Sequence, residues 1–158
     1  MKQIPLTQGK FALVDDEDYG YLMQWKWFCD KGYAARSVHI KNPDGSRTSN
    51  KIFMHRVIAQ TPKGMYTDHI DCDRANNQKS NLRVSTNAEN NRNVMTRKDN
   101  TSGYKGVTWR NRRWAAQIRF KGKNIHLGLF DDKNEAARAY NEAALNLFGE
   151  FAKLNSTP

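Results

Sequence analysis

The C-terminal third of the chain carries the pattern that most restricts its fold. Over 114–121, apolar side chains at even-numbered positions alternate with mostly polar ones at odd-numbered positions. This is the two-residue period of a half-buried strand. Shorter strand patterns lie on either side, and a helix is predicted to begin at Asp132 and to end at Gly149. We therefore expect 103–158 to form a three-stranded antiparallel sheet packed on one helix.

The two faces of this sheet are expected to differ. In the third strand, Ile125, Leu127 and Leu129 should share one face, and Asn124 and His126 the other. The helix should bury a stripe of small and apolar residues, which are Ala136, Ala137, Tyr140, Ala143, Ala144 and Leu147. The opposite face of the sheet is then basic and exposed.

The first 50 residues are predicted to form short strands joined by turns. Strand-type residues at 32–40 end at the turn sequence Asn42-Pro43-Asp44-Gly45, and an apolar run resumes at 51–54. This order predicts a β-hairpin. The region contains no chemical motif, so we expect it to be a scaffold.

The next region, 51–97, is predicted to form a ββα unit. Short strands at 65–71 and 81–85 flank a polar loop, and Thr86 with Glu89 forms a capping box at the start of a helix. The whole chain is therefore expected to be an α+β protein. Its expected parts are a domain at 1–97 (scaffold 1–50, ββα core 51–97), a linker at 98–102 and a second domain at 103–158.

Positive charge is concentrated in the second domain. The net charge is +10, and between Gly103 and Lys123 seven basic residues occur without an acidic one, which is typical of a surface that binds a polyanion. The sequence contains no membrane-spanning or secretory segment. No apolar run approaches the roughly 20 residues of a membrane helix, and the first residues lack a signal peptide's apolar stretch. We expect a cytoplasmic, DNA-associated protein that is neither secreted nor membrane-bound.

The two cysteines, Cys29 and Cys72, stand far apart in the sequence, which excludes a zinc site built on cysteine pairs.

Asp68 and His69 are the candidates for chemistry. Cutting a phosphodiester at neutral pH needs a metal ion that neutralises developing charge and a base that activates water. Hard oxygen ligands suit Mg²⁺ or Mn²⁺. On one strand the two adjacent side chains would diverge, but a strand that ends between them could direct both at one phosphate. Asn90, on the capped helix, could supply a second oxygen ligand through its amide carbonyl.

Around these residues the chain resembles the HNH (ββα-metal) nuclease family, especially its phage and intron-associated members. The matching blocks are Asp68-His69-Ile70-Asp71, Asn76-Asn77, Asn81-Leu82-Arg83 and Glu89-Asn90-Asn91-Arg92-Asn93. The resemblance implies that His69 is the catalytic general base and that Asp68 and Asn90 hold one metal ion. It also implies that Asn81 braces the loop carrying His69. The last motif position is Asn rather than His, and Cys72 stands where Gly is usual, so the loop there is expected to have altered geometry.

Other residues near these blocks have two interpretations each. His55 resembles a recurring family element, but we favour its interpretation as a hydrogen-bonded structural histidine. Asn76 and Asn77 either belong to the site or are turn formers, which we favour. Arg83 and Arg92 are either solvated or bind DNA phosphates.

The third region resembles the ethylene-response-factor (APETALA-type) DNA-binding domain. The matching segments are Tyr104-Lys105-Gly106-Val107, Trp114-Ala115-Ala116-Gln117-Ile118-Arg119, Leu127-Gly128, Ala136-Ala137-Arg138-Ala139-Tyr140 and Leu154-Asn155. That family lays its sheet into the major groove of DNA. The resemblance implies DNA contacts by Lys105, Thr108, Arg110, Gln117, Arg119, Asn124 and His126. We add Lys121, the basic residue that ends the second predicted strand. Thr108 and Asn124 replace arginines, His126 replaces a tryptophan and Gln117 replaces a glutamate, so the plant family's preferred DNA sequence is not expected here.

These features predict a metal-dependent DNA endonuclease, nicking or cutting both strands, of the phage or mobile-element homing type. The alternative is a catalytically inactive DNA-binding transcriptional regulator. Trp109 and Trp114 are expected in the core, so the sheet should lack the exposed aromatics on which single-stranded RNA stacks. No heptad pattern forces dimerisation, and we expect a monomer or weak homodimer on double-stranded DNA.

Overall fold

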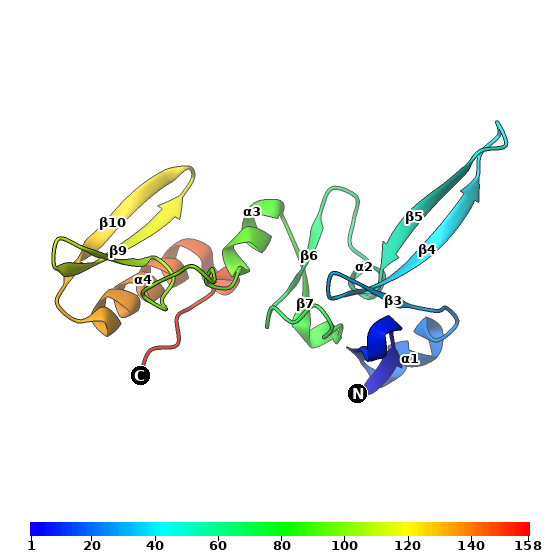
Figure 1. Ribbon diagram of the computed structural model, residues 1–158, viewed down its shortest axis with the longest axis horizontal. Helices are drawn as coiled ribbons and strands as arrows, with labels where there is room; N and C mark the ends of the chain where they lie inside the picture. Colours follow the sequence, from blue (N-terminus) through cyan, green and yellow to red (C-terminus); the bar gives the residue numbers. More distant parts are fainter. The chain divides into compact units, whose positions relative to one another are not determined.

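The computed structural model describes residues 1–158 and divides them into two compact units, Met1–Asn90 and Asn91–Pro158. Small antiparallel sheets alternate with a few helices, which confirms the expected α+β class (Figure 1). No helix combines the length and the apolar character needed to cross a membrane.

The first unit holds three small antiparallel sheets: β1 with β2, β3 with β4 and β5, and β6 with β7. Its elements are β1 (Lys2–Pro5), η1 (Thr7–Gly9), β2 (Phe11–Val14), α1 (Asp16–Leu22), β3 (Phe28–Asp30), β4 (Tyr33–Lys41), β5 (Arg47–Phe53), α2 (Met54–Ile58), β6 (Tyr66–His69), η2 (Lys79–Asn81), β7 (Leu82–Ser85) and α3 (Asn87–Asn90). The core gathers Ile4, Val14, Leu22, Trp27 and Met54, which are all buried. Burial of these apolar side chains joins β1, β2, α1 and α2 into one body.

The predicted hairpin is confirmed as β4 and β5, which pair in register from Ala35 opposite Phe53 to Lys41 opposite Arg47. In Figure 1 this hairpin, coloured cyan, extends well beyond the rest of its unit. Its turn is closed by a hydrogen bond from the Asn42 amide to the Ser46 carbonyl at 2.8 Å.

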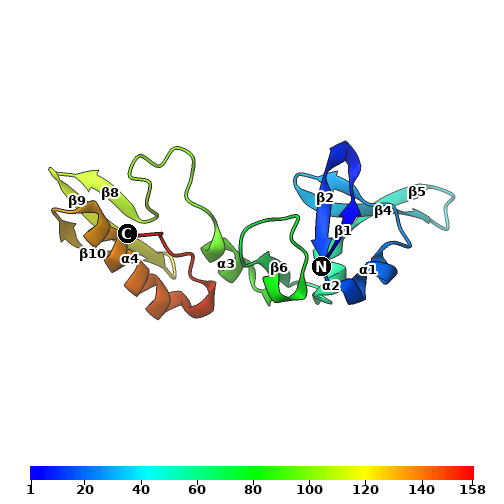
Figure 2. The ribbon, with the colours of Figure 1, turned by 90° about the horizontal axis from the view of Figure 1, so that it is seen from below.

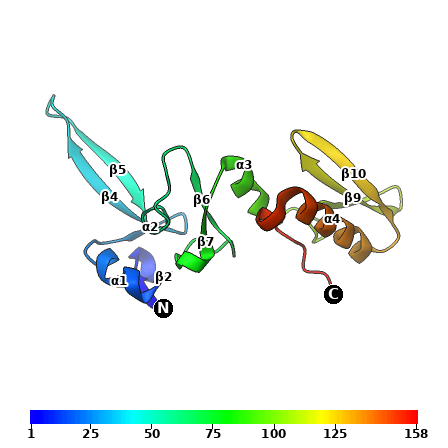
Figure 3. The ribbon, with the colours of Figure 1, turned by 180° about the vertical axis from the view of Figure 1, so that it is seen from behind.

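The predicted order of strand, loop, strand and capped helix is also present, as β6, the loop to β7, β7 and α3 (Figure 3). Both halves of the capping box form. The Thr86 amide donates to Glu89 Oε2 at 2.8 Å, and the Glu89 amide donates to Thr86 Oγ1 at 3.3 Å. The helix is short, because α3 ends at Asn90.

The second unit is a three-stranded antiparallel sheet with one long helix on one of its faces (Figure 2). Its elements are η3 (Asn91–Asn93), β8 (Val107–Arg110), β9 (Arg113–Phe120), β10 (Lys123–Phe130), α4 (Lys133–Phe148) and η4 (Gly149–Phe151). Asp132 caps α4 by accepting a hydrogen bond from the Glu135 amide at 3.3 Å, and Gly149 ends it with a φ of 55°. Both predicted ends of the helix are therefore confirmed.

One predicted strand face is wrong. The register of β10 against β9 shifts between His126 and Gly128, so Leu127 is an extra residue in the strand. A bulge of this kind reverses the alternation of the residues that follow it. Leu129 therefore lies on the free face and is 41% exposed, while Phe130 packs in the core.

The predicted domain boundaries at 97 and 103 stay a prediction. Residues of the predicted linker are hydrogen-bonded within the second unit, because Asn100 Nδ2 and Ser102 Oγ both donate to the Tyr104 carbonyl, at 3.0 and 2.9 Å. Ser102 is buried.

Candidate functional site

Asp68 and His69 lie at the end of β6 and are both buried, with exposures of 4% and 6%. Our interpretation required the strand to end between these two residues, and it does not. Both pair with β7, with Asp68 opposite Arg83 and His69 opposite Leu82. Alternation along the strand gives the two side chains different neighbours. The chain turns directly afterwards, where the Cys72 amide donates to the His69 carbonyl at 2.9 Å.

The His69 imidazole is surrounded by two rings and one amide. The Tyr33 ring centroid is 5.9 Å away and that of His55 is 5.1 Å away, while His69 Nε2 lies 3.4 Å from Asn77 Oδ1. Burial lowers the pKa of His69 below its ordinary value of 6.5. The imidazole is therefore mostly neutral at pH 7, which is the form that a general base requires.

His55 supports His69 by packing rather than by hydrogen bonding. Its Nδ1 is buried without a hydrogen-bond partner, so our hydrogen-bonded interpretation is wrong. The ring stacks on Phe53 with a centroid distance of 5.5 Å and contacts Tyr33 at 5.1 Å. Burial is the main cause that lowers the pKa of His55 to about 3, and electrostatic interactions with His69 and Arg56 lower it further.

Asn81 fixes the loop that follows His69. Its Nδ2 donates to Asp71 Oδ1 and to the Asn76 carbonyl, both at 2.9 Å. Its Oδ1 accepts from the Asp71 amide at 3.0 Å. Asn76 adds a side-chain hydrogen bond to Asp71 Oδ2 at 2.8 Å. One buried amide thus holds both ends of the loop, although a catalytic role for Asn81 stays a prediction.

Asn77 is the site residue that our sequence interpretation missed, because we favoured a turn former there. It is fully buried, its amide donates to the Leu13 carbonyl at 2.8 Å, and its Nδ2 donates to the Ala75 carbonyl at 3.0 Å. These contacts direct Oδ1 toward His69. The available signal was its position inside one of the four matching blocks.

Cys72 occupies a backbone conformation that favours glycine. Its φ is 69°, in the left-handed region where a side chain costs roughly 1–2 kcal/mol. The loop thus keeps a glycine-type conformation although the residue differs.

Asp68 is paired with a cation. Arg83 Nη2 and Nε donate to Asp68 Oδ2 at 2.7 and 2.9 Å, and the two side chains are only 12% and 6% exposed. Arg83 therefore has a carboxylate partner within the protein. A buried carboxylate is costly without compensation, and the Arg83 guanidinium supplies the counter-charge for Asp68 inside the fold.

A divalent ion would find few protein ligands here. Residues 1–158 contain no group of three or more His, Cys, Asp or Glu side chains that could hold a metal ion. The Asp68 carboxylate and the Asn90 amide oxygen are both hard donors, and α3, which carries Asn90, packs against β6 and β7. Hard oxygen donors of this kind suit Mg²⁺, which keeps several waters and binds through one or two carboxylates and substrate phosphates.

The second unit offers a basic sheet face. Gln117 lies opposite His126, and Arg119 opposite Asn124, so these four side chains share the face turned away from α4. All four are exposed, as are Thr108, Arg110 and Lys121. Trp109 is 56% exposed, so the expectation that it lies in the core is wrong. The Trp109 ring lies edge-on against the ring of the half-buried Trp114, and the two ring centroids are 4.8 Å apart.

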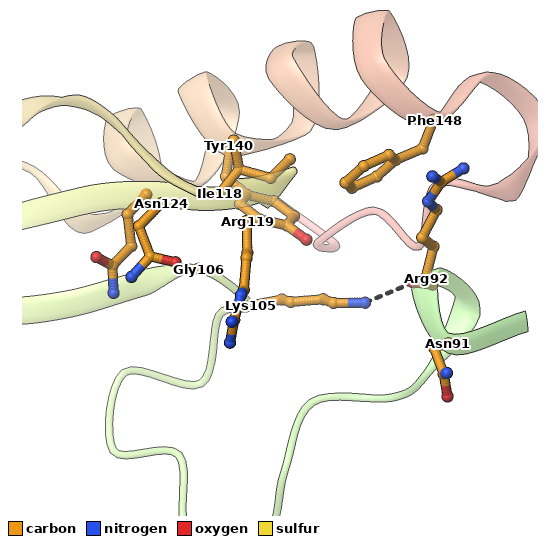
Figure 4. Close-up of a pocket in the computed structure, with 10 residues that line it drawn as sticks. Asn91, Arg92, Lys105, Gly106, Ile118, Arg119, Asn124, Tyr140 and Phe148 are labelled. Atoms are coloured by element: carbon orange, nitrogen blue, oxygen red, sulfur yellow. Dashed lines mark hydrogen bonds between the residues drawn. The ribbon is translucent and has the colours of Figure 1, made fainter. Parts of the chain in front are cut away.

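A pocket of about 320 Å³ opens beside this face (Figure 4). Arg92, Lys105 and Arg119 bring positive charge to it, and Asn124 adds an amide. Lys105 is half-buried, and its Nζ donates to the Arg92 carbonyl at 2.6 Å, as the dashed line in Figure 4 marks. The Arg92 guanidinium lies 4.8 Å from the Phe148 ring centroid. The pocket could hold an anionic group such as a phosphate.

Comparisons with known proteins find that separate parts of the chain are similar to two families. A family model described as HNH endonuclease matches residues 53–92, and one described as AP2 domain matches 102–150. An uncharacterised HNH endonuclease of Acanthamoeba polyphaga mimivirus is 30% identical over 155 residues, covering 94% of this chain and 76% of the relative. Protein 3.8 of Escherichia phage T7 is 37% identical over 94 residues, covering 58% and 77%. A putative AP2/ERF and B3 domain-containing protein of Oryza sativa subsp. japonica is 46% identical over 59 residues, covering 37% and 19%.

Proposed function

Because this chain belongs to the HNH endonuclease family, we propose that it hydrolyses phosphodiester bonds of double-stranded DNA with the aid of Mg²⁺ or Mn²⁺. The observation that carries the proposal is the neutral, buried His69 at the end of β6, next in the chain to Asp68, which is buried and paired with Arg83. We further propose that the second unit, which matches the AP2 domain, holds the DNA through its basic sheet face. The nuclease would act as a monomer or weak homodimer of the phage or homing type.

The contacts of Asn77 support one assignment of the base nitrogen. Asn77 Nδ2 donates to the Ala75 carbonyl, so the oxygen of that amide faces His69. An oxygen acceptor there selects the tautomer with hydrogen on Nε2, and Nδ1 then carries the lone pair. His69 Nδ1 is therefore the proposed base.

In the proposed reaction, His69 Nδ1 takes one proton from a water molecule while the water oxygen attacks phosphorus in line. A new phosphorus–oxygen bond forms, the bond to the 3′ oxygen breaks, and that oxygen leaves with the electron pair and is protonated by water. Asp68 and Asn90 would hold the ion, which when bound stabilises negative charge on the phosphate and on the leaving oxygen. Asn81 would keep the loop after His69 in place, as its three hydrogen bonds to the loop suggest.

The alternative is a catalytically inactive DNA-binding regulator, which the AP2-type relatives favour. The presence of Asp68, His69 and Asn90 together argues against it, because binding alone needs none of the three.

The test uses supercoiled plasmids that carry a library of genomic fragments, incubated with the full chain and Mg²⁺, Mn²⁺ or EDTA. We expect relaxed or linear plasmid with either metal ion and none with EDTA. Plasmid that is bound but stays supercoiled in all three conditions would support the regulator instead.

A further inference from the structure

The hairpin of β4 and β5, which we expected to be a scaffold, is exposed to solvent over most of its length, as a binding surface would be. From Ser37 to Lys51 every residue is exposed except Val38 and Asn42, which are half-buried. Figure 1 shows the two strands projecting from their unit. A two-stranded ribbon that packs on nothing gains little stability from its own length, so its length calls for a different explanation.

One face of the hairpin is polar and basic. Residues directly opposite in an antiparallel pair share a face, and the register pairs Ser37 with Lys51, His39 with Ser49 and Lys41 with Arg47. We call these six residues the ribbon face. Its cations at the outer end, Lys41 and Arg47, have no acidic partner, whereas Lys51 near the base donates to Asp30 at 2.8 Å.

The opposite face is apolar or neutral over most of its length. It carries Val38, Ile40, Thr48 and Asn50, and nearer the base the Arg36 guanidinium lies 4.3 Å from the Trp25 ring centroid. The two faces therefore differ in charge, and only the ribbon face is complementary to a polyanion.

The turn at the tip is well ordered by local hydrogen bonds. Asp44 Oδ1 accepts from the Ser46 amide at 2.9 Å, and Gly45, with a φ of 83°, donates to the Asn42 carbonyl at 3.0 Å. Asn42 Nδ2 also donates to Ser46 Oγ at 2.8 Å. A preorganised arm of this kind loses little conformational entropy on binding.

The ribbon face is continuous with the surroundings of His69. Tyr33 and Phe53 occupy the same side of the hairpin at its base, following the alternation of β4 and β5. The Tyr33 ring contacts His69, and Phe53 stacks on His55. A substrate that lies along the ribbon face is thereby led to the candidate catalytic histidine.

We propose that the ribbon face docks in the major groove of duplex DNA on one side of the phosphate that is cut. This inference rests on the proposed function, because it takes duplex DNA as the substrate of the His69 site. The major groove is about 12 Å wide and admits a two-stranded ribbon. The ribbon face covers five residues of β4, from Ser37 to Lys41. They extend over about 13 Å at roughly 3.3 Å per step, which corresponds to about four base pairs of B-DNA at roughly 3.4 Å each.

The test measures binding of the full chain by fluorescence anisotropy, in EDTA so that no cutting occurs. The probes are a labelled 30-base-pair DNA duplex of mixed sequence and an RNA duplex of the same sequence. The hairpin variant is Lys41→Ala with Arg47→Ala. The matched control is Lys10→Ala with Lys26→Ala, which removes the same charge from exposed positions of the same unit outside the hairpin.

On DNA we expect the hairpin variant to bind about tenfold more weakly than the control, with a log–log salt slope smaller by about 2. On RNA we expect the two variants to bind alike, because the major groove of A-form RNA is too deep and narrow for side chains to read.

Equal affinities of the two variants on DNA would overturn the proposal. An equal loss on DNA and RNA would also overturn it, since it would show phosphate attraction without groove docking. A wild-type chain that binds DNA but never cuts it would contradict the proposed function and leave this comparison intact.

Discussion

Arg83 donates two hydrogen bonds to one oxygen of Asp68, from Nη2 at 2.7 Å and from Nε at 2.9 Å. The two residues lie directly opposite each other on β6 and β7. Strand pairing therefore places the guanidinium, and the guanidinium holds the carboxylate in one orientation beside the candidate base.

Replacing Arg83 by Ala should destabilise the first unit by about 3 kcal/mol, because it leaves the Asp68 carboxylate buried without a counter-charge. Urea unfolding of the variant measures this loss. Arg112→Ala, at an exposed arginine of the second unit, is the control and should change stability by less than about 0.5 kcal/mol. Equal stability of the two variants would mean that the Asp68–Arg83 pair contributes nothing.

His55→Phe should remove part of the acid sensitivity of the fold. Because burial lowers the pKa of His55 from 6.5 to about 3, the folded state takes up a proton on this ring less readily than the unfolded chain. The stability that His55 contributes is therefore present above pH 6.5 and is lost as the pH falls toward 3. A phenylalanine keeps the ring contacts with Phe53 and Tyr33 but cannot be protonated.

The free energy of unfolding, measured in urea at pH 7.5, 5.5 and 4.5, checks this prediction. We expect similar values for the two proteins at pH 7.5, and a smaller loss for His55→Phe on acidification. Parallel pH profiles would show that His55 does not resist protonation in the fold.

Gly106→Ala should disrupt the second unit. Gly106 has a φ of 74°, and an added Cβ would lie 2.5 Å from the Gln117 carbonyl oxygen and closer still to the Tyr140 ring. Backbone strain and overpacking together should cost about 4 kcal/mol. Gly122 has a φ of 80° but open space around it, so Gly122→Ala isolates the strain alone and should cost about 1 kcal/mol. Thermal melts of both variants measure the loss of stability. Equal losses would contradict the close packing of Gly106 against Gln117 and Tyr140.

Arg119→Ala should weaken duplex binding and reduce the log–log salt slope by about 1, because it removes a proposed contact between the exposed sheet face and phosphate. Titration of a labelled DNA duplex at several salt concentrations measures the slope. Arg138→Ala, on α4 and 57% exposed at the side chain, serves as the control and should leave the slope as it is in the wild type. An unchanged slope in Arg119→Ala would exclude this residue from the DNA interface.

Local patterns in the sequence predicted most of the fold correctly. The alternation over β9, the cap at Asp132 and the capping box at Thr86 each depend on residues close in the chain, and each is present. The face of Leu129 was mispredicted because the bulge at Leu127 depends on how β10 pairs with β9, and nothing in β10 alone marks it.

The candidate site was predicted less completely, for the same reason. The block containing Asp68 and His69 could be found from residue order and spacing. The contacts of His69 with Tyr33, His55 and Asn77 join parts of the chain that are distant in sequence or separated by a loop. Such contacts follow from tertiary packing, so pattern reasoning could assign neither the packing role of His55 nor the position of Asn77.

The central claim is that His69 is the base of a phosphodiester hydrolase. The most direct measurement compares the wild type and His69→Ala on a DNA site found in the plasmid library, at saturating protein and in Mg²⁺, with the duplex affinity of each determined in EDTA. We predict that the rate of strand cleavage falls at least about 100-fold, as expected for loss of a general base, while the affinity changes less than about twofold. Cleavage by His69→Ala at the wild-type rate would contradict the account.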